Sequence, residues 1–382
     1  MIQINNLADC CGCTACNSIC THDAIKMVPD ALGFLYPKVD KNKCVECGLC
    51  EKVCAFNSHY DTGLNLGEPL TYAVRHKSIK EINTSRSGAA FIALSDWVLE
   101  QGGIVYGVGY TEHFRVVHKR AATKEERNEF KGSKYVQSDM NTIFRQVKND
   151  LKNGLLVLFS GTPCQTSGLN SYVGDKLRKK LYLIDIICHG VPSPAVWHSY
   201  LDYMENKYGL EITKVNFRDK EKFGWGEHKE SFNFGDKYIS AYTYTALYYK
   251  SLMLRPACGR CHFTNIHRPS DITLADFWGW EKIDKNLNGD NKGVSLLLVN
   301  TLKGKEWFDC IGESINSIKI TIAQCLQPQL EKPTELSPLS EKFKNDFIKY
   351  GFSYVSRKYI KTNWRMRLYS VLKRHIVRIF FL

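Results

Sequence analysis

The chain has 382 residues, of which 44% are hydrophobic and 24% charged, a balance typical of soluble globular proteins with one to three domains. No stretch of about 18 apolar residues is present, so we expect no membrane-spanning helix. The first residues, MIQINNLADCC, lack the basic and apolar regions of a signal peptide, and we expect a cytoplasmic protein. The net charge is +13, but eight Lys and Arg residues after Tyr354 supply much of it, and we expect no nucleic-acid partner.

Two stretches near the N-terminus repeat one cysteine spacing, C-x2-C-x2-C-x3-C. The first contains Cys10, Cys13, Cys16 and Cys20, and the second contains Cys44, Cys47, Cys50 and Cys54. Two-residue spacers let a tight loop wrap three thiolates around one [4Fe–4S] cluster, while the fourth thiolate ligates the other cluster of a two-cluster ferredoxin. The spacing therefore predicts one cluster on Cys10, Cys13, Cys16 and Cys54 and a second on Cys44, Cys47, Cys50 and Cys20.

Paired CxxC motifs also occur in zinc ribbons, but zinc gives no reason for two copies of a four-cysteine spacing. The proline that commonly follows the fourth cysteine is replaced by Thr21 and Ala55, which alters the local turn and removes no ligand. Cys11 is out of register with both motifs, and we expect it to be buried without binding metal. In a reducing compartment, clustered thiols of this kind indicate metal ligands rather than disulfides.

After residue 70 the pattern changes to alternating strands and helices. Residues 55–70 are polar and contain glycine, which is typical of a linker. Apolar runs predict strands at 103–110, 114–118, 155–160 and 181–187, and other segments predict helices at 85–103, 139–154 and 193–209, the last capped by Ser193 and ended by Gly209. Buried strands separated by helices indicate an α/β core.

Four more cysteines lie at positions that suit a functional site. Cys164 follows the predicted strand 155–160, Cys188 follows the predicted strand 181–187, and Cys258 and Cys261 form a CGRC motif. Ligands of open α/β sheets gather beyond the carboxyl ends of the strands. The four thiols can therefore converge on a third metal site, but free cysteines are often simply buried, and the spacing leaves both alternatives open. No P-loop or complete dinucleotide fingerprint is present, so direct NAD binding is not expected.

Several stretches, in a fixed order, resemble the beta subunits of coenzyme F420-reducing hydrogenase and F420-dependent dehydrogenases. They are SRSGAAF (85–91), KGSKYVQS (131–138), GTPCQTSGL (161–169), DIICHGVPSP (185–194), RPACGRC (255–261) and SDITLADFWG (270–279). A two-cluster ferredoxin-like extension is common in that family. We therefore expect an α+β protein in three parts: a ferredoxin-like domain at 1–58, an α/β flavin-binding domain with a mixed sheet at 70–330, and a basic helical tail at 331–382.

The resemblance implies a third [4Fe–4S] cluster on Cys164, Cys188, Cys258 and Cys261, with FAD beside it. The implied flavin contacts are Ser87, Gly88, Gly132, Ser133, Lys134, Tyr135 and Gln137, with Asp276, Phe277 and Gly279 near the isoalloxazine ring. Local chemistry agrees, because glycine lets the backbone approach a pyrophosphate, helix-start N–H groups favour its charge, and Lys134 can neutralise it. A buried strand end explains Phe277 equally well, and we interpret His189 as a loop residue.

These parts together predict an iron–sulfur flavoprotein oxidoreductase. A flavin exchanges a hydride with a small-molecule donor or acceptor and single electrons with the clusters. The ferredoxin-like domain would then exchange electrons with a redox partner protein or ferredoxin. The family name implies coenzyme F420 as substrate, but relatives act on other substrates. The alternatives are a ferredoxin-dependent flavin reductase of another metabolite, such as a glycan-pathway intermediate, and a non-catalytic electron-transfer subunit.

The C-terminal tail has a helical pattern that the resemblance does not cover. Trp364, Leu368, Val371, Leu372 and Ile379 fall on one apolar stripe, while Arg365, Lys373 and Arg374 lie off it. A basic amphipathic helix of this kind can bind an anionic membrane surface or an acidic partner. The alternative is that the stripe packs on the α/β core, as most amphipathic helices do.

Overall fold

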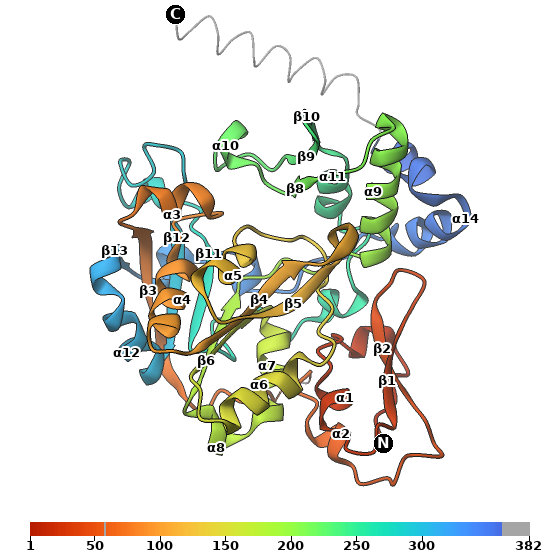
Figure 1. The fold of residues 1–382 in the computed structure, drawn as a ribbon, viewed down its shortest axis with the longest axis horizontal. Helices are drawn as coiled ribbons and strands as arrows, with labels where there is room; N and C mark the ends of the chain where they lie inside the picture. Colours follow the sequence, from red (N-terminus) through yellow and green to blue (C-terminus); the bar gives the residue numbers. More distant parts are fainter. Residues whose placement is uncertain (57–58, 361–382) are drawn as a thin grey trace, which may run out of the picture.

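A single large β-sheet forms the centre of the molecule (Figure 1), and the computed structural model describes residues 1–56 and 59–360. The sheet has eight strands in the order β13-β3-β12-β11-β7-β6-β4-β5. Four consecutive strands of this order, β11, β7, β6 and β4, pair in parallel, and the remaining neighbours pair antiparallel. The predicted mixed sheet is therefore confirmed.

The strands have the following bounds: β1 Ile25–Pro29, β2 Leu35–Val39, β3 Asn65–His76, β4 Ile104–Tyr110, β5 Val116–Ala121, β6 Val157–Gly161, β7 Leu181–Ile186, β8 Lys214–Asn216, β9 Glu230–Phe234, β10 Lys237–Ala241, β11 Ile272–Asp276, β12 Ser295–Thr301 and β13 Ile315–Ile320. The four strands predicted from apolar runs are present as β4, β5, β6 and β7. The predicted linker at 55–70 is partly wrong, because β3 already begins at Asn65. The first residues of β3 are largely exposed, which gave this strand start a polar, linker-like sequence.

The helices have the following bounds: α1 Ala15–Ile19, α2 Leu49–Lys52, α3 Ile79–Thr84, α4 Ala90–Glu100, α5 Lys124–Arg127, α6 Ile143–Lys152, α7 Pro163–Val173, α8 Asp175–Arg178, α9 Pro194–Tyr208, α10 Lys220–Phe223, α11 Thr243–Tyr249, α12 Leu302–Cys310, α13 Ile322–Cys325 and α14 Ser340–Tyr359. The three predicted helices are α4, α6 and α9. The Ser193 hydroxyl accepts a hydrogen bond from the backbone of Val196, and Gly209 ends α9 with a φ of 66°. Both predicted ends of α9 are therefore confirmed.

Helices cover both faces of the central sheet. On one face, α4 and α12 pack apolar side chains against the middle strands, with Leu94 and Trp307 fully buried. On the other face, α6 and α7 do the same, with Phe144 and Leu169 fully buried. The carboxyl ends of β4, β6, β7 and β11 lie at one edge of this three-layer arrangement, since these strands run parallel. Short connections at that edge are where an open α/β sheet binds ligands.

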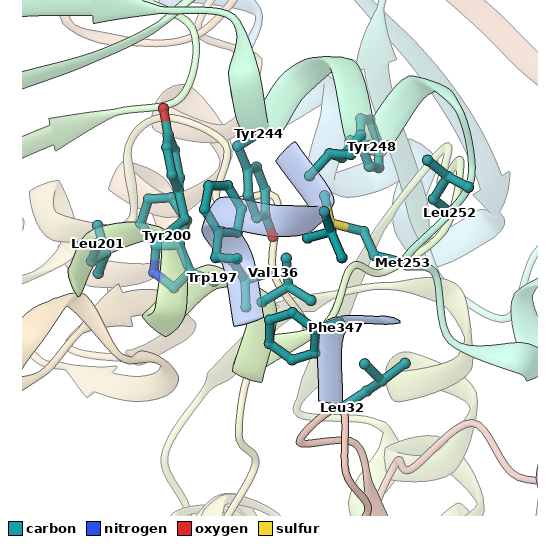
Figure 2. Close-up of a cluster of buried hydrophobic side chains, with 14 of the residues drawn as sticks. Leu32, Val136, Trp197, Tyr200, Leu201, Tyr244, Tyr248, Leu252, Met253 and Phe347 are labelled. Carbon is teal, nitrogen blue, oxygen red and sulfur yellow. The ribbon is translucent and has the colours of Figure 1, made fainter. Parts of the chain in front are cut away.

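The N-terminal segment consists of the hairpin β1–β2 with α1 and α2 beside it (red in Figure 1). Leu32 and Phe34 of the hairpin are buried in a hydrophobic cluster with Trp197 and Tyr200 of α9. Figure 2 shows Leu32 in this cluster, below Val136 and Phe347. The N-terminal segment therefore shares part of its hydrophobic core with the α/β region.

Helix α14, Ser340–Tyr359, forms much of the first part of the predicted tail at 331–382. It bends at Gly351, whose φ is 72°, and buries Phe343 and Phe352 in the same cluster as α9. The predicted amphipathic stripe from Trp364 to Ile379 lies outside the described residues. Within residues 1–56 and 59–360, no helix combines the length and the apolar composition needed to cross a membrane.

Helix α7 approaches the first cysteine motif closely at Gly168. A Cβ atom added to Gly168 would lie 2.7 Å from the Cys13 Sγ and 2.9 Å from the Cys13 Cβ, both well inside van der Waals contact. Helix α1 also contacts α6 and α7. The absence of a side chain at residue 168 thus lets the cysteine loop lie directly on the α/β region.

We expect Gly168→Ala to lower the free energy of unfolding by about 1–3 kcal/mol, the usual cost of overpacking. This direction is opposite to the intrinsic preference of a helix, which favours alanine over glycine by about 1 kcal/mol. Urea denaturation of anaerobically purified protein measures the difference. Ser171→Ala, at an exposed position of the same helix, is the matched control and should leave stability unchanged or slightly higher. A Gly168→Ala variant as stable as the wild type would contradict the close contact.

Candidate functional site

A large cavity lies over the carboxyl ends of β4, β6, β7 and β11. Its volume is about 460 Å³, within the usual range for small-molecule and cofactor sites. The sequence-predicted flavin contacts that line it are Ser87, Gly132, Ser133, Lys134, Tyr135 and Asp276. These residues come from the loop before α4, the loop after α5 and the end of β11, so the fold brings together segments that lie far apart in the chain.

The 131–135 loop gives one wall of this cavity an open backbone and a lysine. Gly132 has a φ of 78°, and a Cβ added there would meet no atom within 4 Å. The Lys134 ammonium donates hydrogen bonds to the backbone carbonyls of Glu129 at 2.7 Å and Lys131 at 3.0 Å. Burial lowers the pKa of Lys134 to about 7. An anionic group in the cavity would favour the charged form of this lysine.

Four other residues of the predicted flavin set do not line the cavity. Gly88 lies against β3 and β12, where an added Cβ would be 2.3 Å from the carbonyl oxygen of Val74. The Gln137 side chain is buried and donates to the backbone carbonyl of Cys11 at 2.9 Å. Phe277 is fully buried in a separate apolar cluster, and Gly279 forms the turn after β11 with a φ of 90°.

Two arginines that the sequence analysis did not single out, Arg86 and Arg218, line the same cavity and face Asp276. Asp276 accepts a hydrogen bond from Arg218 at 2.5 Å, and the Arg86 Nε lies 3.9 Å from the same carboxylate oxygen. Burial alone would raise the pKa of Asp276, yet the two guanidinium groups hold it below its ordinary value. The Nε and Nη1 atoms of Arg86 are buried without a hydrogen-bond partner among the described residues. Two guanidinium groups against one carboxylate leave this corner with positive charge. Arg86 belongs to the SRSG stretch that carries part of the family resemblance, and this was the sequence signal that could have identified Arg86 as a site residue.

An aromatic wall stands beside these charges. Trp278 stacks on Trp225 with ring centroids 4.5 Å apart, and the Arg218 guanidinium lies 5.7 Å from the Trp278 ring. Tyr248 and His228 also line the cavity. Flat aromatic surfaces next to a few polar groups suit a planar ring system such as a flavin.

A second cavity contains four of the predicted metal ligands: Cys164, Cys188, Cys258 and Cys261. Cys164 lies in the first turn of α7, and Cys188 follows β7. Cys258 lies in the short 3-10 helix η4, Pro256–Arg260, and Cys261 directly follows that helix. The backbone N–H of Val191 points at the Cys258 Sγ at 3.4 Å. Such donors favour the thiolate form that binds metal. The structure therefore brings these four cysteines together, as a third metal site would require.

A third cavity contains the predicted first set of the N-terminal motif: Cys10, Cys13, Cys16 and Cys54. For the predicted second set, Cys20 and Cys50 pack against one small apolar cluster, and the backbone N–H of Ile2 lies 3.3 Å from the Cys50 Sγ. Cys44 and Cys47 lie in the loop before α2, and Cys47 is exposed. Burial raises the pKa of Cys54 to about 11, and a metal bound in this cavity would favour its thiolate.

The three cavities share walls. Cys11 lines both cysteine cavities, and its pKa is raised first by the neighbouring thiols of Cys13 and Cys164 and then by burial. The segment Cys188–Val191 lines both the second cysteine cavity and the large cavity. Within that segment, the buried Nε2 of His189 has no described partner, while its Nδ1 lies 3.2 Å from the Gln329 amide. Cys11 is thus buried, as predicted, and it lies in the wall between the two cysteine cavities.

In the described part of the chain, no three or more His, Cys, Asp or Glu side chains surround a point closely enough to hold a single metal ion. A single zinc ion needs all its ligand atoms within about 2.0–2.3 Å of one point. A cubane cluster instead spaces four thiolates around four irons. Cysteine-lined cavities with N–H groups directed at sulfur atoms fit the donor set of such a cluster.

Comparison with known proteins gives a family relation for one region. Residues 155–321 match the family model that describes the C terminus of the beta subunit of coenzyme F420 hydrogenase/dehydrogenase. A search of curated proteins found no match. Among solved structures, a chain of the F420-reducing [NiFe] hydrogenase complex from Methanosarcina barkeri is similar with a TM-score of 0.47 and 16% sequence identity, over 77% of this chain and 92% of that chain. The region 155–321, which includes Cys164, Cys188, Cys258 and Cys261, is therefore similar to the C-terminal part of these beta subunits.

Proposed function

We propose that this chain is an iron–sulfur flavoprotein oxidoreductase. It would transfer electrons between clusters bound to its N-terminal cysteine motifs and a substrate in the large cavity. In this proposal two [4Fe–4S] clusters bind the N-terminal motifs, a third binds Cys164, Cys188, Cys258 and Cys261, and FAD occupies the large cavity. When bound, a flavin exchanges two electrons with a substrate and single electrons with clusters. A redox partner protein or ferredoxin would meet the chain near the exposed Cys47.

The observation that carries this proposal is the order of the cavities. The first cysteine cavity adjoins the second through Cys11, and the second adjoins the large cavity through Cys188–Val191. Cofactors held in these adjoining cavities would exchange electrons directly, without a mobile carrier. The family match supports the same interpretation, since its description names an oxidoreductase and the matched region includes the four cysteines predicted to bind the third cluster.

The residues of the large cavity divide into two groups with separate tasks. At the 131–135 loop, the open backbone of Gly132 and the ammonium of Lys134 suit a pyrophosphate. Next to this loop, Arg218 donates a hydrogen bond to the Tyr135 hydroxyl at 3.3 Å, and together with Trp278 it provides a positive charge and a flat surface for a ring system or an anionic substrate. Coenzyme F420 is the substrate we propose, because the matched family is described by that coenzyme.

Turnover separates an enzyme from an electron-transfer subunit. The isolated, reconstituted chain should reduce or oxidise F420 in the presence of an artificial one-electron donor or acceptor. Turnover of a different metabolite would change only the substrate assignment. A chain that binds its cofactors and exchanges electrons with a ferredoxin, but turns over no small molecule, would be an electron-transfer subunit.

Metal content tests the three clusters directly, since three [4Fe–4S] clusters require about 12 irons per chain. We expect Cys164→Ser to lose about a third of the iron and sulfide after anaerobic purification, because one thiolate of the third cluster is removed. The electron paramagnetic resonance signals of the two N-terminal clusters should persist. Cys325→Ser is the matched control, because Cys325 is also buried but lines none of the three cavities described above. Equal iron in Cys164→Ser and wild type would make Cys164 a structural residue.

Flavin retention tests the large cavity. We expect heat-released flavin to be FAD, and Lys134→Ala to bind it about 10- to 100-fold more weakly, as the loss of one charge-assisted hydrogen bond would cause. Fluorescence titration of flavin-depleted protein measures the change. Lys119→Ala is the control, since Lys119 pairs with Glu129 outside the cavity. Cluster-loaded wild-type protein that binds no flavin would contradict the catalytic part of the proposal.

A further inference from the structure

Arg255 lies between the two cysteine cavities and is only 1% exposed. It immediately precedes η4, three residues before Cys258, and it lines the second cysteine cavity. Its guanidinium group reaches into the N-terminal segment, where Nε donates to the backbone carbonyl of Cys10 at 2.7 Å. Arg255 thus connects the segment that carries one predicted ligand set to the loop that carries the other.

The guanidinium donors all meet neutral oxygen atoms or sulfur. Nη1 donates to the Gln137 side chain at 2.8 Å, and Nη2 donates to the backbone carbonyl of Leu35 at 2.9 Å. The Nη2 atom also lies 3.7 Å from the Cys10 Sγ. The ring of Tyr36 lies 4.2 Å from the guanidinium carbon. None of these partners is a carboxylate.

This lack of a carboxylate distinguishes Arg255 from the other arginines buried in the described part of the chain. Arg127, Arg178, Arg218 and Arg268 each form an ion pair with an aspartate, at 2.6, 3.0, 2.5 and 3.2 Å respectively. A buried charge without a counter-charge is strongly unfavourable. The partner that would offset this cost is the negative charge of a thiolate-ligated cluster beside Cys10.

Gly12 shows that the close approach of the guanidinium is built into the loop. A Cβ added to Gly12 would lie 2.8 Å from the Arg255 Nη1, and Gly12 has a φ of 71°, which side chains disfavour. The glycine between Cys10 and Cys13 therefore leaves room for the cation inside the first cysteine motif. Gln137, which the resemblance implied as a flavin contact, accepts a hydrogen bond from this guanidinium and donates one to the carbonyl of Cys11.

We propose that Arg255 is the counter-charge of the cluster held by Cys10, Cys13, Cys16 and Cys54 and raises its reduction potential. This proposal rests on the cluster occupancy proposed above. One-electron reduction adds a negative charge to the cluster, breaks no bond and needs only an external electron donor such as dithionite. A fixed cation nearby stabilises the reduced form more than the oxidised form, so it favours electron uptake. The cluster that adjoins the second cavity would thereby accept electrons more readily.

A purely structural role predicts a different result. Arg255 also pins the N-terminal segment to η4 through hydrogen bonds to the carbonyls of Cys10 and Leu35, with a third to the Gln137 side chain, and lysine cannot reproduce that fork. Charge and fork can be separated by two variants. Arg255→Lys retains the charge and loses the fork, while Arg255→Gln loses the charge and retains some hydrogen bonding.

The experiment is a redox titration of reconstituted full-length protein, followed by electron paramagnetic resonance, together with iron analysis. At a fixed potential, Arg255→Gln should lower the ratio of reduced to oxidised first cluster by about tenfold or more, a shift of about 59 mV for a one-electron couple. Arg255→Lys should stay close to wild type. Arg178→Gln is the matched control, because Arg178 is a buried arginine whose counter-charge is Asp271, and it should leave every cluster potential unchanged.

Each outcome decides the question. If Arg255→Gln fails to load the first cluster while Arg255→Lys loads it fully and keeps the wild-type potential, the positive charge is the required feature and the counter-charge role stands. Equal potentials in wild type and Arg255→Gln, or equal damage by Gln and Lys, would overturn it in favour of the structural role. Wild-type protein that binds no iron would instead contradict the proposed function, so the two failures are distinguishable.

Discussion

The contact between the first cysteine motif and the α/β region is the constraint on which the site depends. Cys13 lies against Gly168 of α7, and Arg255 reaches from the start of η4 to the backbone of Cys10. These two contacts place the first cysteine cavity against the second, with Cys11 in the wall between them. If the N-terminal segment were attached only by a flexible linker, a predicted electron route through it would require repeated docking. The shared core of Leu32 with Trp197 acts in the same direction.

The parallel strands supply the other half of the arrangement. Because β6 and β7 run in the same direction, the segments that contain Cys164 and Cys188 leave the sheet at one edge, and the large cavity opens at that edge as well. Thiols and cavity are therefore neighbours for a topological reason, although each cysteine comes from a different element. The loop Cys188–Val191 contributes to both cavities and connects cysteine chemistry to ligand binding within one short segment.

Sequence patterns predicted the parts of this site that depend on local spacing. The strands before Cys164 and Cys188 and the caps of α9 were predicted, because apolar runs and capping residues are local signals, while the mixed sheet was expected from the family resemblance. The start of β3 was missed, since its first four residues are half-buried or exposed and include Gly67 and Glu68, which interrupt any apolar run. Arg218 and Trp278 were missed for another reason: they become site residues only when β11 and the segment before β9 meet in space. No local pattern distinguishes such an arginine from a solvated one.

The buried arginines show where charge is satisfied within the fold and where it is not. The ion pair of Arg178 joins the end of α8 to Asp271, and that of Arg268 joins the segment before β11 to Asp185 of β7; each aspartate is fully buried. In both pairs the charge of the arginine has a counter-charge within the protein itself. Arg255 is buried to the same degree, but its acceptors are two carbonyls, an amide oxygen and a thiol. Since a folded chain rarely buries a charge without compensation, the chemistry beside Cys10 is the place to look for the missing negative charge. The same argument explains why sequence alone could not assign Arg255: the RPACGRC stretch contains the residue, but only the fold shows which charges surround it.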